Sequence, residues 1–290
     1  MIDAYFIHLL ILIGIYSILA VSLQLSLGYS GLLNLGHIAF FGIGAYASAM
    51  IAFAGFPFWV CLFLAGIISA FFGWALLIPT NKLKGDYLAL ATLGFSFVVY
   101  AVLLNWTELT RGSLGLPGIP RPNILGIDFS ENVFFLILVF IVALISYLFI
   151  QRMCNSPFGK TLESTRDDEI ATKSLGKNTI KIKSISLVIS AFFAGMAGSL
   201  FAFYFTFIDP SSFTFLNLIP VLLIVIIGGL ANLPGTILAT IIIILLPEPL
   251  RFIGLPASIL GPARQIIYAV ILLLIIYFKP RGFYGKIDLE

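Results

Sequence analysis

Long runs of apolar residues constrain this sequence more than any other feature. Seven runs have about the length of a membrane span: 4–27, 37–54, 58–78, 86–104, 133–150, 184–207 and 264–278. A bilayer core of about 30 Å is crossed by roughly 20 apolar residues in a helix. Only 10% of the residues are charged, which is too few to cover a water-soluble globule, where about 25% is usual. The sequence therefore predicts an integral membrane protein.

Two shorter apolar runs, 216–228 and 234–247, are separated by a stretch that contains Gly228, Gly229 and Pro234. A similar glycine-containing break covers residues 28–36. Such breaks occur at membrane depth where protein or a cavity covers the exposed backbone. The predicted fold is an all-α polytopic membrane helical bundle of about eight to ten spans, in one transmembrane domain over residues 1–290.

The positions of lysine and arginine predict the orientation. Segment 151–183 holds seven of the sixteen basic residues. Smaller basic groups are Lys82 and Lys84, and Lys279, Arg281 and Lys286. The positive-inside rule places all three groups in the cytoplasm. Residues 28–36 then lie on the same side, whereas residue 1 and loop 105–132 lie outside. A cytoplasmic C-terminus also requires an even number of crossings after residue 183, so the break at 228–234 is predicted to be a turn.

No motif points to an enzyme. Gly159, Lys160 and Thr161 resemble the end of a phosphate-binding P-loop, but that pattern needs a glycine five residues before Gly159, where the chain has Cys154. His8 and His37 form no metal-binding pair. The sequence therefore predicts no catalytic residues, no metal site and no cofactor. The net charge of +3 implies no nucleic-acid partner.

Segment 151–183 carries the signals of two short helices outside the membrane. Ser156 suits an N-cap, Pro157 suits the first helical position, and Gly176 suits a helix end. The acidic group at 167–169 could begin the second helix. Apolar residues also occur at fixed positions in this hydrophilic segment: Phe158, Leu162, Ile170, Ala171 and Leu175. A solvated basic loop is one interpretation; a docking element is favoured because it explains the apolar positions.

Five polar residues within the predicted spans are candidates for a translocation path: Gln24, Asn34, His37, Thr92 and Asn217. Polar side chains in lipid are costly and often line pathways. The equally strong alternative is that they hydrogen-bond neighbouring helices. The small residues at 191, 194, 195, 198 and 202 predict close helix packing. Few charges lie within the spans, which argues against a proton- or sodium-coupled carrier.

Several blocks of the sequence resemble one known family. They are LGYSGLLNLGHIAFFGIGAYAS at 27–48, GDYLALATLGF at 85–95, TRGSLGLPGIP at 110–120, SPFGKTLESTRDDEIATKSLG at 156–176, ISAFFAGMAGSLFA at 189–202 and IIGGLANLPGTILA at 226–239. Together they resemble the permease subunits of branched-chain amino acid ABC importers, of the LivM type. The blocks occur in order over most of the chain.

The resemblance implies a membrane protein of the prokaryotic cytoplasmic (inner) membrane, surrounded by lipid and built like a type II ABC importer permease. Its implied partners are a homologous LivH-type permease, two cytoplasmic ATP-binding subunits and an extracytoplasmic solute-binding protein, which loop 105–132 would face. The implied ATPase-coupling residues are Pro157, Phe158, Gly159, Leu162, Asp168, Glu169, Ala171, Leu175 and Gly176. The family pattern Glu-Ala-Ala-x-x-x-Gly is only partly kept, since residues 170–172 read Ile-Ala-Thr before Gly176.

Three other functions stay open at this point. A related ABC permease could carry urea or short amides, because such permeases share the same blocks. A stand-alone secondary carrier would need no ATPase, and a membrane scaffold would move no solute.

Overall fold

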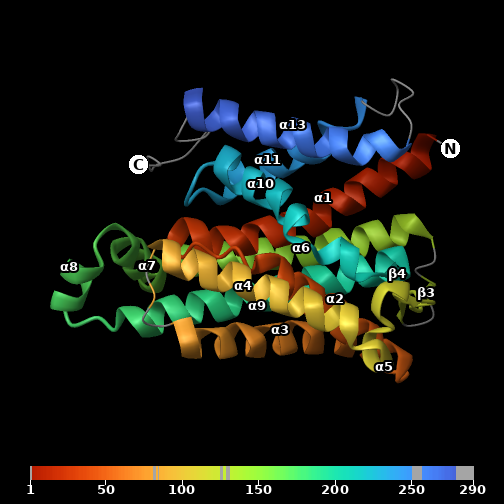
Figure 1. Ribbon diagram of the computed structural model, residues 1–290, viewed down its shortest axis with the longest axis horizontal. Helices are drawn as coiled ribbons and strands as arrows, with labels where there is room; N and C mark the ends of the chain where they lie inside the picture. Colours follow the sequence, from red (N-terminus) through yellow and green to blue (C-terminus); the bar gives the residue numbers. More distant parts are fainter. Residues whose placement is uncertain are drawn as a thin grey trace.

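The computed structural model describes residues 2–80, 83, 85–124, 127–128, 131–249 and 257–278. The long elements form a bundle of roughly parallel and antiparallel helices (Figure 1). They are α1 (Ile2–Gln24), α2 (His37–Phe53), α3 (Phe58–Thr80), α4 (Gly85–Asn105), α6 (Asn132–Cys154), α9 (Thr179–Phe205), α10 (Ile219–Gly228), α11 (Leu233–Leu245) and α13 (Ala257–Phe278).

Short elements connect these helices. A π-helical turn, η1 (Leu25–Tyr29), extends α1, and two short helices, α7 (Pro157–Asp167) and α8 (Glu169–Ser174), join α6 to α9. The remaining pieces are α5 (Thr107–Thr110), the 3₁₀ turns η2 (Gly112–Leu114), η3 (Pro210–Phe213) and η4 (Phe215–Leu218), and the strands β1 (Leu116–Pro117), β2 (Asn123–Ile124), β3 (Ile127–Asp128) and β4 (Phe207–Ile208).

The described residues contain five helices that are long and apolar enough to cross a membrane, and four shorter apolar helices of 10–17 residues. This confirms the predicted polytopic all-α bundle. The predicted turn at 228–234 is also confirmed, because α10 ends at Gly228 and α11 begins at Leu233. The two backbones meet there: a Cβ on Gly228 would lie 2.6 Å from the Thr236 nitrogen.

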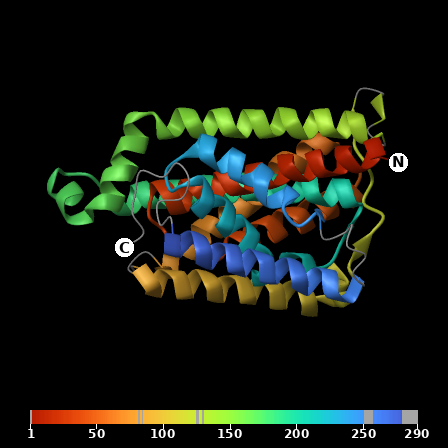
Figure 2. The ribbon, with the colours of Figure 1, turned by 90° about the horizontal axis from the view of Figure 1, so that it is seen from above.

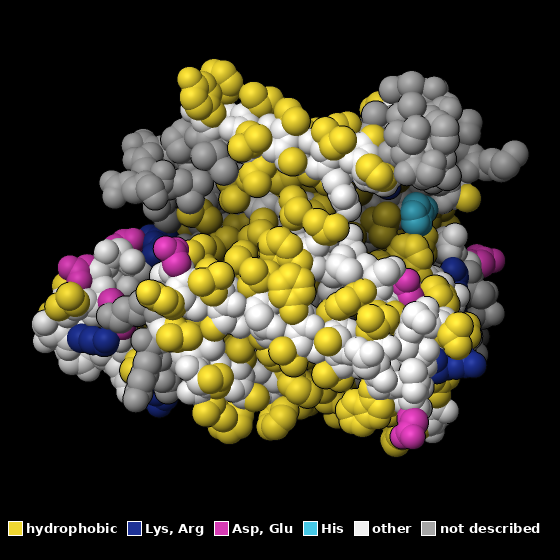
Figure 3. Space-filling view, in the orientation of Figure 1, with side chains coloured by type: hydrophobic (Ala, Val, Ile, Leu, Met, Phe, Trp, Pro, Cys, Tyr) yellow, Lys and Arg dark blue, Asp and Glu magenta, His cyan; other side chains and the backbone are white. Residues whose placement is uncertain are grey.

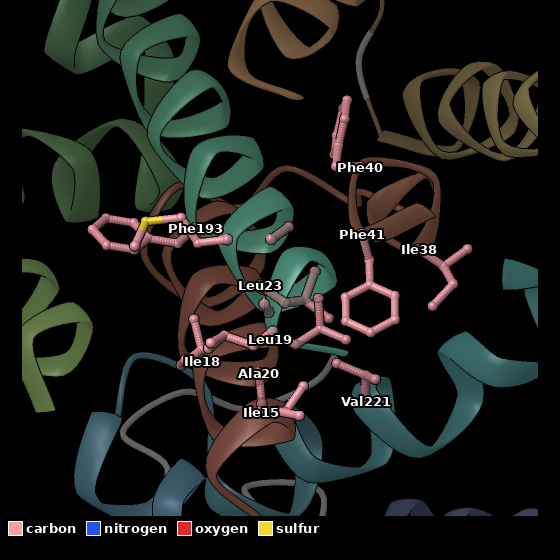
Figure 4. Packing of buried hydrophobic residues seen from close by; sticks show 14 of the residues in the cluster. Ile15, Ile18, Leu19, Ala20, Leu23, Ile38, Phe40, Phe41, Phe193 and Val221 are labelled. Atoms are coloured by element: carbon pink, nitrogen blue, oxygen red, sulfur yellow. The ribbon is translucent and has the colours of Figure 1, made fainter. Parts of the chain in front are cut away.

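The core is built around α1 and α9. Side chains from α1, α2, α9 and α10 gather in one apolar cluster (Figure 4). Leu19 and Leu23 of α1 and Phe41 of α2 are almost completely buried in it. Helix α9 packs between α2 and α3, where Gly195 faces Ser69 and the Ala65 carbonyl, and Gly198 faces Phe41 and Ala45. No side chain fits at either glycine, so the predicted close packing by small residues is confirmed.

The middle of the molecule has an apolar surface. Figure 3 shows hydrophobic side chains across the centre and charged side chains at the two ends. Large apolar residues such as Phe71 on α3, Leu90 on α4 and Leu144 on α6 are more than half exposed. Soluble monomers rarely expose such a continuous apolar area. The band matches a protein surrounded by lipid or by a second membrane protein.

The two ends of the bundle differ. Helices α7 and α8 project from one end, here named the coupling end, and α5 and the strands lie at the other, the loop end (Figures 1 and 2). Residues from 31–34, 77–85 and 165–187 line a single cavity at the coupling end. The three segments were predicted to share one side of the membrane, and they do share one end of the molecule. Which end is cytoplasmic stays a prediction.

Two of the basic groups behind that prediction, Lys82 with Lys84 and the group at 279–286, lie outside the described residues.

Loop 105–132 is more structured than an open loop. β1 pairs antiparallel with β4, with Leu116 opposite Ile208. The amides of Gly118 and Ile119 donate to the Thr206 carbonyl at 3.0 and 3.1 Å. β2 and β3 form a second two-residue pair within the loop. Contacts with the end of α9 thus order the first half of the loop.

Candidate functional site

The α6–α7 corner begins segment 151–183. Ser156 occupies the predicted N-cap position of α7, and Pro157 follows it. Its side chain makes no cap, however: the Ser156 hydroxyl donates to the Met153 carbonyl at 2.6 Å. A side-chain cap would instead accept from the amide of Phe158 or Gly159, the second and third residues of the helix. Gly159 is packed against the backbone of Cys154, so the corner needs a glycine there.

Helix α8 is the predicted second short helix, and Asp168 caps it. The Asp168 carboxylate accepts hydrogen bonds from the amides of Ile170 and Ala171, both at 2.9 Å. Gly176 follows the helix with φ +76°, a left-handed conformation that favours glycine. Both signals were readable from the sequence because caps depend on neighbouring residues alone.

Glu169 anchors α8 to the start of α9. Its carboxylate accepts from Lys173 at 2.8 Å, Lys183 at 2.9 Å and the Thr179 hydroxyl at 3.1 Å. Partial burial acts to raise the pKa of Glu169, but these hydrogen bonds outweigh it and lower the pKa to about 2. The side chain therefore stays ionised and holds the two helices together.

The nine predicted coupling residues divide into two groups. Pro157, Asp168, Ala171, Leu175 and Gly176 are exposed, whereas Phe158, Gly159, Leu162 and Glu169 are buried or half-buried. On α8, Ile170 is 75% and Leu175 is 80% exposed. Ile170, Ala171 and Leu175 are named here the α8 patch. Helix α8 projects beyond the ends of the long helices (Figure 2).

Asn34 lies in the first break in the membrane helices, residues 25–36, and His37 follows it at the start of α2. The Leu19 carbonyl can only accept, so His37 Nε2 donates to it at 3.1 Å. His37 Nδ1 then accepts from the Asn34 amide at 3.4 Å. Both side chains are buried. His37 thus joins the start of α2 to α1, as the helix-bonding alternative expects.

The Thr92 hydroxyl supplies hydrogen bonds to the backbone of the same break. Its hydroxyl accepts from the Leu35 amide at 3.0 Å and lies 3.2 Å from the Leu33 carbonyl. Thr92 and Asn34 both line the cavity at the coupling end, which has a volume of about 220 Å³. Its other lining residues are Gly31, Leu32, Leu33, Leu77, Thr80, Leu83, Gly85, Leu88, Thr165, Arg166, Glu169, Ile180, Lys183, Ser184 and Leu187.

Gln24 joins the first break to the second, residues 229–232. Its amide nitrogen donates to the Gly229 carbonyl at 2.6 Å, and the side chain is completely buried. Asn232 caps α11 by accepting from the Gly235 amide at 3.1 Å. Sequence reasoning did not select Asn232, although an asparagine just before Leu233 and Pro234 is a typical N-cap signal.

Asn217 lies apart from the other four. Its amide donates to the carbonyls of Ser211 and Ser212, both at 3.0 Å, within the turns that follow β4. The structure therefore brings Asn34, His37 and Thr92 together at the first break, places Gln24 beside it, and leaves Asn217 elsewhere. Whether any of them contacts solute stays a prediction.

Sequence reasoning missed a contact that Arg166 makes. Its Nη1 donates to the Gly28 carbonyl at 2.8 Å, from α7 to the first break. No local pattern signals this hydrogen bond, because the two residues lie 138 positions apart.

Comparison with known proteins agrees with this architecture. Residues 5–278 match the model of the family described as "Branched-chain amino acid transport system / permease component". The high-affinity branched-chain amino acid transport system permease protein LivM of Salmonella typhimurium is 41% identical over 82% of this chain and 61% of its own length. The Escherichia coli LivM protein is 40% identical with the same coverage.

The LivH permease protein of Escherichia coli is 24% identical over 95% of this chain and 92% of its own length. The chain thus spans about three-fifths of the two LivM relatives, and nearly all of LivH. No solved structure matches the chain. The family match covers nearly all the described helices, and the chain belongs to the family of permease components of branched-chain amino acid transport systems.

Proposed function

We propose that this protein is a membrane-spanning permease subunit of an ATP-driven ABC importer that moves branched-chain amino acids. The observation that carries the proposal is the α8 patch, an apolar surface on a capped helix outside the apolar band. Such a surface fits a protein partner. Family membership and the similarity to LivM and LivH permeases indicate which process that partner serves.

The complete importer would contain a LivH-type permease, two cytoplasmic ATP-binding subunits and an extracytoplasmic solute-binding protein. Segment 151–183 would be its coupling segment, with the α8 patch against the ATPase and the coupling end in the cytoplasm. The chain would serve as a single transmembrane domain and supply no ATPase site of its own. Loop 105–132, ordered against the end of α9, would face the binding protein.

Transport would follow alternating access. Closure of the two ATPases on ATP would move the coupling segments of the paired permeases. The bundles would then rock between outward-facing and inward-facing arrangements around a shared pathway. Among the five polar candidates, Asn34 and Thr92 would contact the solute, because both line the cavity at the coupling end.

The first test is uptake of labelled leucine, isoleucine, valine and urea by cells with and without the gene. Loss of amino-acid uptake that the restored gene reverses is the expected result. Loss of urea uptake alone would move the substrate to the urea and short-amide class. Uptake by the purified protein alone, driven by an ion gradient in liposomes, would establish a secondary carrier and contradict the proposal.

A second test addresses the α8 patch. Ala171→Arg places a charge in the centre of an apolar interface, so ATPase subunits should no longer co-purify in mild detergent while the permease still inserts. Lys160→Ala is the matched control, because Lys160 is an exposed residue of α7 whose described ion pair is with Glu163. Equal ATPase recovery from wild type and Ala171→Arg would remove the docking role from this surface.

A further inference from the structure

Arg166 makes a direct contact between the coupling segment and the first break, which follows α1. Its Nη1 donates to the Gly28 carbonyl at 2.8 Å. The Asp167 carboxylate holds Nε at 2.9 Å and Nη2 at 2.8 Å, so the guanidinium is oriented from its own helix. Only 16% of the Arg166 side chain is exposed. This partly buried, charge-assisted bond is stronger than an ordinary surface contact.

The shape of the first break exposes the acceptor. In an α-helix the Gly28 carbonyl would accept from the amide of Leu32, four residues later. Here the chain has left η1, and the Leu32 amide donates instead to the Ser26 carbonyl, six residues earlier, at 2.9 Å. Gly28 therefore keeps a free carbonyl, and Arg166 takes it. A buried carbonyl needs such a partner.

Gly31 gives Arg166 its approach to the break. Its φ of +67° lies in the left-handed region, and a Cβ there would be 2.8 Å from Arg166 Cγ. A residue with a side chain would be strained at this φ and would also push the arginine away. The backbone of the break and the stem of Arg166 thus fit against each other.

The contact continues from the first break to the second. A Cβ on Gly28 would lie 2.8 Å from the Ala231 nitrogen and 2.7 Å from Gln24 Oε1. Gln24 in turn donates to the Gly229 carbonyl at 2.6 Å. The Gly28 carbonyl therefore accepts a hydrogen bond from Arg166, and the backbone of Ala231 in the second break packs against the Gly28 Cα. A displacement of α7 would reach both breaks through two hydrogen bonds and one backbone contact.

We propose that Arg166 is a positioning residue that passes movement of the coupling segment to the two helix breaks, through its bond to the Gly28 carbonyl. The proposal rests on the proposed function, since it presumes that an ATPase moves α7 and α8. It adds the specific connection by which that movement enters the membrane domain. Arg166 acts on the pathway through Gly28 and Gln24 and needs no contact with solute.

The test uses the complete importer in liposomes, with two variants of Arg166. Arg166→Ala removes the side chain, and Arg166→Met keeps an apolar stem against Gly31 while removing every donor. Both should retain the ATPase subunits and hydrolyse ATP. The leucine moved per ATP hydrolysed should fall about tenfold, the factor expected from one lost charge-assisted hydrogen bond. Lys160→Ala, on the same helix, should keep the wild-type ratio.

A second readout separates transmission from a merely structural role. ATP binding should change amide hydrogen exchange over residues 25–36 in the wild-type complex, and this change should be absent from both Arg166 variants. An unchanged transport-to-ATP ratio would overturn the proposal, as would release of the ATPase by Arg166→Met. A wild-type complex that contains no ATPase would instead contradict the proposed function.

Discussion

The two helix breaks satisfy their backbone in different ways. The backbone of the first break, residues 25–36, hydrogen-bonds side chains of three other helices: Thr92 of α4, Arg166 of α7 and Ser186 of α9. The Ser186 hydroxyl donates to the Leu25 carbonyl at 3.1 Å. The second, residues 229–232, is capped by its own Asn232 and receives a bond from Gln24 of α1. Both contain buried residues, and buried backbone groups without a hydrogen-bond partner are costly.

On our proposal, this difference decides which break responds to movement of α7. The hydrogen bond from Arg166 connects the first break to α7, and the bond with Thr92 connects it to the wall of the cavity. The second break has side-chain bonds from Gln24 of α1, from its own Asn232 and from Thr236 of α11. We therefore expect movement of α7 to reach the first break through Arg166, and the second through the contact of Gly28 with Ala231.

The largest expected effect comes from separating the two breaks. In Gly28→Leu the new side chain would meet the backbone nitrogen of Ala231, which cannot move aside as a flexible side chain could. We expect a loss of about 3 kcal/mol in the free energy of unfolding, at the upper end of overpacking effects. The apparent melting temperature in detergent and the monodisperse fraction measure it.

Gly94→Ala is the matched control for Gly28→Leu, because Gly94 on α4 has open space around it. Alanine is the better helix former by about 0.5–1 kcal/mol, so this variant should melt no lower than the wild type. Equal melting temperatures for Gly28→Leu and Gly94→Ala would mean that the breaks do not need their contact.

Smaller losses of stability should distinguish the bond that Gln24 donates to the second break from the local cap made by Asn232. Gln24→Ala leaves the buried Gly229 carbonyl without its donor, which should destabilise the protein by about 1–3 kcal/mol. Asn232→Ala removes one helix cap and should cost about 1 kcal/mol. Thermal unfolding of both variants tests the order. A larger loss from Asn232→Ala would show that the second break is stabilised mainly by its own residues.

The smallest effect concerns the attachment of α8. Because the pKa of Glu169 is lowered to about 2 from its usual 4.5, its stabilisation is complete above pH 4.5 and is lost as the pH falls toward 2. The pairs are partly exposed, so the loss should be under about 1 kcal/mol. Cleavage of residues 168–183 by an acid-active protease should accelerate as the pH falls from 4.5 toward 2.

Glu169→Gln provides the comparison for that pH profile. Its neutral amide cannot titrate, so cleavage should be faster than in the wild type at pH 5.5 and should change less on acidification. The same acceleration in both proteins would assign the acid sensitivity to other carboxylates.

Local features were predictable from the sequence. The positions of the spans followed from the lengths of apolar runs, and the ends of α8 followed from Asp168 and Gly176. The distribution of basic residues grouped 28–36, 79–85 and 151–183 on one side, and these segments do line one cavity. Ser156 does occupy the predicted N-cap position of α7, but its hydroxyl donates to the Met153 carbonyl and does not bond the α7 amides.

The sequence by itself determined the membrane bundle, the order of its helices and the presence of a capped helical element between α6 and α9. Each of these depends on apolar length, glycine spacing or caps within a few residues. Only the tertiary structure decided that Leu162 faces inward while Leu175 faces outward, that Arg166 bonds Gly28, and that Gln24 joins the two breaks. Those contacts depend on how distant segments pack, and no local pattern encodes that packing.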